Sequence, residues 1–166
     1  MKKTKPLHRA VFDCMIYVQG AARIKNPANA CFELVEAGIV ELYLSRETLE
    51  EIEDVLTRPK FRKRFPILTD EMIAAFLSDI KSKVKIFKNV PSVFKYPRDP
   101  KDEKYINLAA RAKADYIVSR DNDLLDLMTG FDDESKEFRQ RFRPLKIVAP
   151  VEFLRIIREK DLSLNP

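Results

Sequence analysis

Short apolar runs alternate along the chain with longer segments whose apolar residues recur at helical spacing. The short runs are rich in β-branched residues and have the length of buried strands; they cover residues 9–13, 40–44, 84–87, 116–119 and 146–148. The longer segments predict helices at residues 28–37, 46–57, 70–81 and 102–113. Residues 129–144 are polar and charged and show no strand pattern.

This alternation predicts an α/β fold. Strands joined by helices form right-handed crossovers, so we expect a parallel sheet with helices on both faces and ligands at the carboxyl ends of the strands. At 166 residues the chain has the size of one domain, 1–166. We expect a core over about residues 9–157 and flexible ends at 1–7 and 160–166.

Composition narrows the class of protein further. Hydrophobic residues make up 45% and charged residues 34%, which excludes disordered and collagen-like chains. The basic start of the chain is followed by an apolar run that Asp13 interrupts, so we predict no secretion signal, no membrane association and a cytoplasmic location. Cys14 and Cys31 lack metal-ligand spacing and are expected to be reduced core residues. The net charge of +5 favours polyanionic partners.

Acidic residues follow two of the predicted strands. Asp13 ends the first strand, where a buried carboxylate needs a cation or hydrogen bonds, although a loop-capping role explains it equally well. Ser119, Asp121 and Asp123 follow the fourth strand, where Asp121 alternatively fits the N-cap of a short helix.

The helix predicted at 46–57 carries five acids, and helical angles separate them. At about 100° per residue, the face opposite the core stripe holds Glu47, Glu50 and Asp54, which are expected to be solvated. Glu51 and Glu53 flank the stripe. Glu51 lies nearer the helix N-terminus, beside the strand ends, so we prefer it as a ligand by roughly two to one.

A third group of acids opens the helix predicted at 102–113. Asp99 fits an N-cap, Pro100 the first helical position and Asp102 the N3 position of a capping box, which is a purely structural explanation. However, Asp102 shares the apolar face of this helix, whereas Glu103 is rotated about 100° from it towards solvent. This orientation favours Asp102 as a metal ligand.

Four carboxylates, from Asp13, Glu51, Asp102 and Asp121, thus arrive separately at one edge of the sheet. Their mutual repulsion calls for a cation, and hard oxygen ligands select Mg²⁺ or Mn²⁺ over zinc. A metal held in this way activates water and orients a phosphate for phosphodiester hydrolysis, without a nucleophilic side chain.

The sequence resembles the PIN-domain family, in particular bacterial and archaeal ribonucleases of the VapC-like type that act as the toxin of a toxin–antitoxin pair. The resemblance covers about residues 9–153 and rests on four motifs: Val11-Phe12-Asp13; Leu49-Glu50-Glu51 with Thr57-Arg58-Pro59-Lys60-Phe61; Arg98-Asp99-Pro100-Lys101-Asp102; and Ser119-Arg120-Asp121-Asn122-Asp123-Leu124-Leu125.

This resemblance implies a three-layer α/β/α sandwich, Rossmann-like, with a central, mostly parallel five-stranded sheet. It further implies a Mg²⁺- or Mn²⁺-dependent endoribonuclease with an RNA substrate, frequent homodimers and an antitoxin protein as partner. The family's acids match Asp13, Glu51, Asp102 and Asp121, with Asp123 as an auxiliary metal ligand and Ser119 at the hydroxyl position.

One position departs from the family pattern. Where the family has Asn two residues after the first Asp, this chain has Met15, which forms no strong hydrogen bond; Gln19, one helical turn later, is a candidate replacement. Met15 motivates an alternative, a catalytically impaired PIN-like module that binds RNA or protein. A phosphatase with Asp13 as nucleophile ranks lower, because such enzymes carry an acid at the position of Met15.

Basic residues interleave with aromatic ones in two segments. Candidate RNA contacts are Arg58, Lys60, Arg62 and Arg120, although a solvated helix face around core aromatics explains the first segment at least as well. The second segment contains Arg139, Arg141 and Arg143 around Phe138 and Phe142. It fits an RNA contact, a solvated helix face around core aromatics, or a surface that docks an antitoxin or a second subunit.

Overall fold

The computed structural model describes residues 8–164 and contains a five-stranded sheet in which all neighbouring strands are parallel. The strand order is β3-β2-β1-β4-β5. Their bounds are β1 His8–Phe12, β2 Val40–Ser45, β3 Lys85–Phe87, β4 Tyr116–Val118 and β5 Lys146–Val148. The predicted strands therefore exist, within one or two residues, and the predicted fold class is confirmed.

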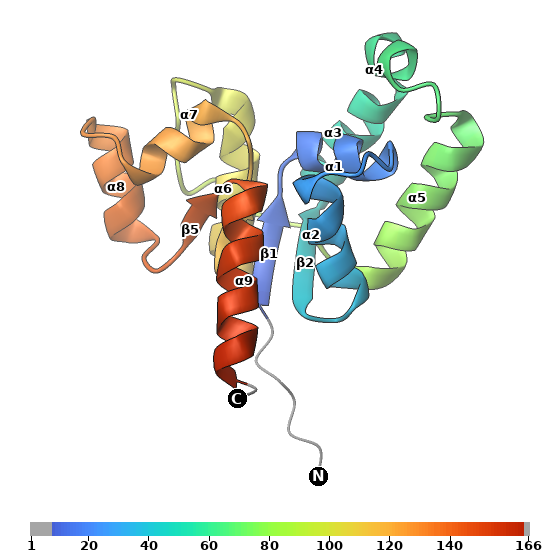
Figure 1. Ribbon diagram of the computed structural model, residues 1–166. Helices are drawn as coiled ribbons and strands as arrows, with labels where there is room; N and C mark the ends of the chain where they lie inside the picture. Colours follow the sequence, from blue (N-terminus) through green and yellow to red (C-terminus); the bar gives the residue numbers. More distant parts are fainter. Residues whose placement is uncertain (1–7, 165–166) are drawn as a thin grey trace.

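Helices cover both faces of the sheet, which gives three layers (Figure 1). One face packs against α1 Cys14–Ala21, α2 Pro27–Glu36, α3 Arg46–Thr57, α4 Pro59–Arg64, α5 Asp70–Lys83 and α9 Pro150–Leu164. The other packs against α6 Glu103–Ala112, α7 Asn122–Leu125, the 3₁₀ turn η2 Asp126–Met128 and α8 Asp133–Arg141. A further 3₁₀ turn, η1 Pro100–Asp102, leads into α6.

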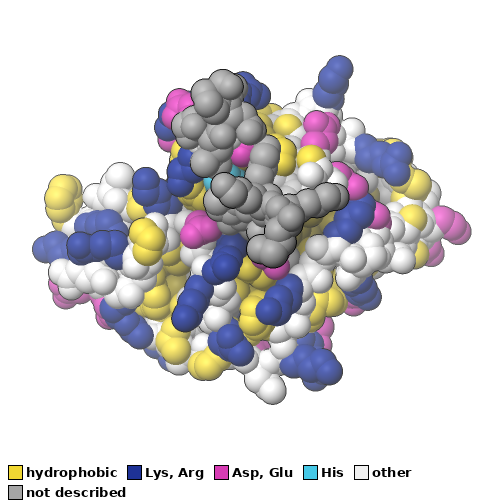
Figure 2. All heavy atoms as spheres, turned by 90° about the horizontal axis from the view of Figure 1, so that it is seen from below, with side chains coloured by type: hydrophobic (Ala, Val, Ile, Leu, Met, Phe, Trp, Pro, Cys, Tyr) yellow, Lys and Arg dark blue, Asp and Glu magenta, His cyan; other side chains and the backbone are white. Residues whose placement is uncertain are grey.

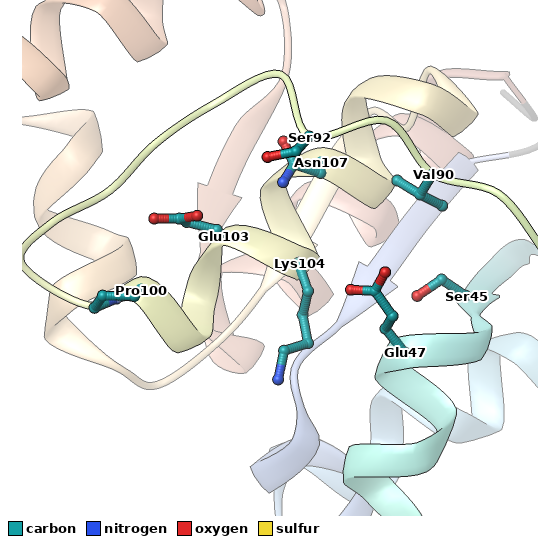
Figure 3. A pocket seen from close by; sticks show the side chains of 8 residues that line it. All are labelled: Ser45, Glu47, Val90, Ser92, Pro100, Glu103, Lys104 and Asn107. Atoms are coloured by element: carbon teal, nitrogen blue, oxygen red, sulfur yellow. The ribbon is translucent and has the colours of Figure 1, made fainter.

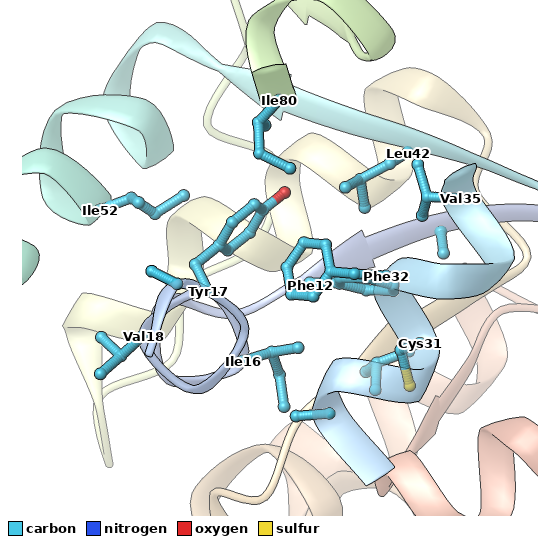
Figure 4. Close-up of a cluster of buried hydrophobic side chains, with 14 of the residues drawn as sticks. Phe12, Ile16, Tyr17, Val18, Cys31, Phe32, Val35, Leu42, Ile52 and Ile80 are labelled. Atoms are coloured by element: carbon cyan, nitrogen blue, oxygen red, sulfur yellow. The ribbon is translucent and has the colours of Figure 1, made fainter. Parts of the chain in front are cut away.

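The strands read as continuous apolar runs because both of their faces are buried. In β1, Ala10 and Phe12 join the core on one face, whereas Val11 joins the core on the other. Figure 4 shows the first core, in which the ring of Phe12 lies among aromatic side chains of α1 and α2. Its centroid is 6.2 Å from that of Tyr17 and 5.3 Å from that of Phe32.

Local signals set the bounds of most helices. Asn26 caps α2, and Ser45 with Thr48 forms a reciprocal capping box at the start of α3. Gly38, just after α2, has a φ of 75°, a left-handed conformation that favours glycine. These caps place α2 and α3 where the periodicity predicts them, and α3 matches residues 46–57.

Three parts of the chain differ from the expectation. Helix α1 has buried residues on several sides, so it lacks a solvated stripe, and a Cβ at Gly20 would come within 2.4 Å of the Phe32 ring. Helix α8 lies inside the polar stretch 129–144 and buries Phe138. Helix α9 continues to Leu164, past the predicted core end and into the predicted flexible tail. The other predicted flexible residues, 1–7 and 165–166, lie outside the described part.

Two global properties bear on function. No helix between residues 8 and 164 combines the length and the apolar composition that crossing a bilayer requires. Viewed from the amino ends of the strands, Lys and Arg side chains are spread over the surface (Figure 2). The positive charge is thus not confined to the opposite edge, where the acidic motifs lie.

Candidate functional site

The acidic motifs meet where the chain reverses its direction across the sheet. From β1 the chain continues to β2 on one side, and from β4 it continues to β5 on the other. β1 and β4 are neighbours, so their carboxyl ends border the crevice where open parallel sheets bind ligands. In Figure 1 this edge lies at the tip of the β1 arrow, between α7 and α1.

Asp13 leaves β1 at this edge and caps α1. Its Oδ1 accepts a hydrogen bond from the Ile16 N–H at 3.2 Å, and its Oδ2 accepts one from the Ser119 hydroxyl. The pKa of Asp13 is raised to about 6, mainly by burial; the charge of Asp121 acts in the same direction, and the hydrogen bonds from Ser119 and Ile16 oppose it. Asp13 therefore has the capping role and also lies beside the other acids.

Ser119 connects the ends of the two central strands. It is fully buried, donates to Asp13 and accepts a hydrogen bond from the Asp121 N–H at 2.9 Å. Asp121 in turn caps α7, because its Oδ1 accepts from the Asp123 N–H at 2.9 Å. Each of these acids thus has a local structural partner and still points to the shared edge.

Four aspartates form the densest acidic group among the described residues. One carboxylate oxygen from each of Asp99, Asp102, Asp121 and Asp123 lies within 4.8 Å of the others. Asp102 is only 8% exposed, and its Oδ2 is buried without a hydrogen-bond partner. Burial, together with the negative charges of Asp121 and Asp99, raises the pKa of Asp102 to about 9. An ionised Asp102 needs a cation at this oxygen.

The donor set fits a hard divalent cation. Four carboxylates offer oxygen ligands alone, which suits Mg²⁺ or Mn²⁺ rather than the softer metals. The unpartnered Asp102 oxygen marks the place where a ligand atom is free. A bound cation would also relieve the repulsion from Asp121 and Asp99, which adds to burial in raising the pKa of Asp102.

Asp99 was not among the predicted site residues. The sequence suggested an N-cap, but its side chain makes no capping hydrogen bond in the structure. Asp99 and Asp102 are three positions apart around a 3₁₀ turn, where side chains at i and i+3 lie one above the other. The pattern Asp99-Pro100-Lys101-Asp102 contains this spacing, which the α-helical cap interpretation misses.

Glu51 lies apart from the four aspartates. Its Oε2 accepts a hydrogen bond from the Lys104 ammonium, and its Oε1 accepts one from the Tyr105 hydroxyl. Burial opposes the charge of Glu51, but the contacts with Lys104 and Tyr105 lower its pKa overall. The expected solvated acids of α3, Glu47, Glu50 and Asp54, are exposed. Glu103 is not solvated as expected, because it accepts from the Tyr96 N–H at 2.8 Å.

Arg98 is a second residue to which the sequence assigns no role in the site. Its Nε lies 2.7 Å from Asp123 Oδ1, and its Nη2 lies 2.8 Å from Asp126 Oδ2. The guanidinium thus compensates part of the negative charge at the outer side of the aspartate group. It also ties the segment before η1 to the start of η2.

Met15 and the two auxiliary polar candidates, Gln19 and Ser119, differ in the contacts that their side chains make. Met15 packs against the core on the α1 side of the sheet. The side-chain carbonyl of Gln19 is buried without a hydrogen-bond partner, so the polar contact suggested for it is not formed through that oxygen. Ser119, in contrast, makes the direct contact with Asp13 described above.

The candidate RNA contacts are mostly engaged within the protein. Arg58 pairs with Asp54, Arg62 pairs with Asp70, and the Lys60 ammonium lies 5.2 Å from the ring centroid of Phe61. Arg120 is exposed and lies between Ser119 and Asp121 in the chain. Of the four, Arg120 is the one whose place in the sequence puts it beside the acidic edge.

A pocket opens next to the acidic edge, between α3 and α6 (Figure 3). Its charged and polar lining residues are Ser45 at the end of β2, Glu47 of α3, and Glu103, Lys104 and Asn107 of α6. Asn107 holds the segment across the pocket, because its Oδ1 accepts from the N–H groups of Val93 and Phe94 at 2.9 and 3.0 Å. Lys104 joins this pocket to Glu51.

Comparison with known proteins gives two findings. The family model described as PIN domain matches residues 9–123, a range that begins in β1 and ends at Asp123. A protein of Methanocaldococcus jannaschii, named only as uncharacterized, is 27% identical over 146 residues, which cover 88% of this chain and 89% of that protein. The matched range contains Asp13, Glu51 and all four aspartates of the acidic group.

Proposed function

This chain belongs to the PIN-domain family, and from that premise we propose that it is a Mg²⁺- or Mn²⁺-dependent ribonuclease that hydrolyses phosphodiester bonds of RNA. The observation that carries the proposal is the buried, unpartnered Oδ2 of Asp102 within a group of four aspartates. Such an oxygen is costly unless a cation binds it. Its place at the carboxyl ends of β1 and β4 supports a catalytic rather than a structural role.

The proposed roles follow from the contacts of each residue. Asp99, Asp102, Asp121 and Asp123 would hold the cation. Asp13 is proposed to complete the centre through the hydrogen bond from Ser119, which fixes the carboxylate next to Asp121. When bound, a divalent ion of this kind activates water and neutralises charge that develops on a phosphate. Arg98 holds Asp123 in place from the outer side.

The excess of positive charge on the chain supports an RNA substrate. The chain carries 31 Lys and Arg against 26 Asp and Glu, although its acids are concentrated at the proposed centre. Cations elsewhere on the surface are therefore in excess and attract a polyanion. Exposed Arg120, between Ser119 and Asp121 in the chain, is proposed as a backbone contact.

We expect the purified protein to cleave single-stranded or loop-containing RNA when Mn²⁺ or Mg²⁺ is present. Gel analysis of labelled RNA should show cleavage that EDTA stops and that excess Mn²⁺ restores. A protein with intact aspartates that binds no Mn²⁺ by calorimetry would refute the proposal. Binding of Mn²⁺ and RNA without cleavage would favour the second candidate, an impaired binding module, for which Met15 is the motivating residue.

The toxin role, with a protein antitoxin and a homodimer, is a finer proposal that rests on the family resemblance. It predicts that expression of the chain arrests bacterial growth and that Asp121→Asn, produced at the same level, does not. Colony counts and immunoblots of both cultures measure this. Unimpaired growth with active enzyme in the lysate would contradict the toxin role and leave the nuclease proposal standing.

A further inference from the structure

The carboxylate of Glu51 and those of the four aspartates differ in how their negative charge is compensated. Both carboxylate oxygens of Glu51 receive a hydrogen bond, one from Lys104 and one from Tyr105. Asp102, in contrast, keeps an oxygen that has no partner. A cation is needed at the aspartates, whereas the charge of Glu51 is already compensated.

The contact of Glu51 with Lys104 is sheltered from solvent. The side chain of Glu51 is 18% exposed and that of Lys104 is 22% exposed. A pair at this depth is screened much less than a surface pair, so separating it would leave a poorly solvated charge on each side. Tyr105 fixes the second oxygen, which leaves the carboxylate little freedom to turn towards another ligand.

The surroundings of Glu51 agree with a fixed, ionised carboxylate. Cys14, the residue after Asp13, lies beside it; burial and the charge of Glu51 raise the pKa of this thiol to about 12. Figure 3 shows the Lys104 side chain leaving α6 and pointing away from Ser92 and Asn107 at the far end of the pocket. Lys104 lines this pocket, and its ammonium contacts Glu51.

We infer that Lys104 is a built-in cation that takes the place of a metal ion at Glu51, so that the centre binds one divalent ion on the aspartates alone. This inference rests on the proposed metal-dependent function. Glu51 is then a positioning residue, which holds Lys104 and Tyr105 at the start of α6, next to Asp102. Lys104 then supplies a positive charge from the protein itself, in addition to that of the bound ion.

Mn²⁺ binding, measured by calorimetry and by the electron paramagnetic resonance signal of free Mn²⁺, tests the inference without an activity assay. The wild type should bind one ion. Glu51→Gln should leave that number unchanged and alter the dissociation constant by no more than about threefold, whereas removal of a ligand such as Asp102 costs about 100-fold, or 2.7 kcal/mol. This comparison does not depend on any lysine variant.

Lys104→Met should expose the charge of Glu51 and create a second, weaker Mn²⁺ site. The double variant Lys104→Met with Glu51→Gln should return to one ion. Lys101→Met is the matched control, because Lys101 is an exposed lysine on η1. This substitution removes the same charge near the aspartates. It should keep one ion, and circular dichroism should show that all variants fold.

Two ions bound to the wild type, or a loss of affinity in Glu51→Gln as large as that in Asp102→Asn, would overturn the inference. The inference would also be overturned if the folded Lys104→Met variant bound only one ion at Mn²⁺ concentrations well above those that saturate the wild type. These results leave the nuclease proposal intact. Failure of the wild type to bind Mn²⁺ at all would instead refute the proposed function itself.

Discussion

Asp102→Asn is expected to abolish metal-dependent RNA cleavage while making the metal-free protein more stable. The substitution keeps the shape of the side chain and removes a buried carboxyl group, which is mostly neutral in the metal-free folded protein at pH 8 and would carry a charge when a cation binds it. Loss of this charge should weaken Mn²⁺ binding by about 100-fold or more and cleavage by about 1,000-fold. At pH 8 the metal-free variant should exceed the wild type by about 2 kcal/mol in the free energy of unfolding, or about 5 °C in Tm.

The sign of this stability change follows from the pKa of Asp102. It is raised from 3.8 to about 9 in the folded protein, so the folded state keeps this proton to a higher pH than the unfolded chain does. The contribution of the protonated form is complete below pH 4 and is lost as the pH rises towards 9. Asp13, with a pKa raised from 3.8 to about 6, acts in the same direction between pH 4 and 6.

Urea unfolding of the wild type and Asp102→Asn at pH 5 and pH 8, each with EDTA and with Mn²⁺, measures these effects. The wild type should lose about 2 to 4 kcal/mol between the two pH values in EDTA and regain stability with Mn²⁺. Asp54→Asn, which alters an exposed ion pair, should change stability by less than about 1 kcal/mol. A wild type more stable at pH 8 than at pH 5 without metal would contradict this account.

Phe12→Ala is expected to have the largest effect on stability, about 3 to 5 kcal/mol. Phe12 is fully buried, and its ring lies 6.0 Å from that of Phe153 and 5.3 Å from that of Phe32, so helices on either side of it lose contacts together. The residue also precedes Asp13. Loosening of β1 should therefore weaken Mn²⁺ binding in the fraction that remains folded.

Phe131→Ala is a control of the same chemistry, because the Phe131 side chain is 85% exposed. It should change the free energy of unfolding by less than about 0.5 kcal/mol. Urea unfolding of both variants in EDTA gives the comparison. Equal losses from Phe12→Ala and Phe131→Ala would show that the core around β1 does not govern stability.

The periodicity of the chain predicts the sheet well because both faces of every strand are buried. Apolar runs such as that of β1 carry this signal directly, and glycine and capping residues mark the ends of α2 and α3. Helix α1 escapes prediction because it is buried on several sides. Helix α8 escapes because its sequence is polar apart from Phe138, and only the tertiary contacts of this ring make it an element of the core.

The acidic site is predicted in part, for a similar reason. Helical angles separate Glu51 from the exposed acids of α3 and place Asp102 inwards. They do not reveal that Lys104, 53 positions after Glu51, compensates its charge. Asp99 is missed because its sequence context fits an α-helical N-cap, whereas the chain forms a 3₁₀ turn there. Such pairings depend on tertiary arrangement, which local spacing does not encode.

The hydrogen bond between Asp13 and Ser119 spans 106 positions of the chain, and this has a consequence for synthesis and folding. Contacts of such separation form late, because a long loop must close first. On the ribosome, β1 emerges long before β4 is synthesised, so the edge of β1 that pairs with β4 stays unpaired during most of synthesis. Its core face is covered by Phe153 later still. A growing polypeptide therefore has no assembled acidic centre until at least the first 123 of its 166 residues have been made.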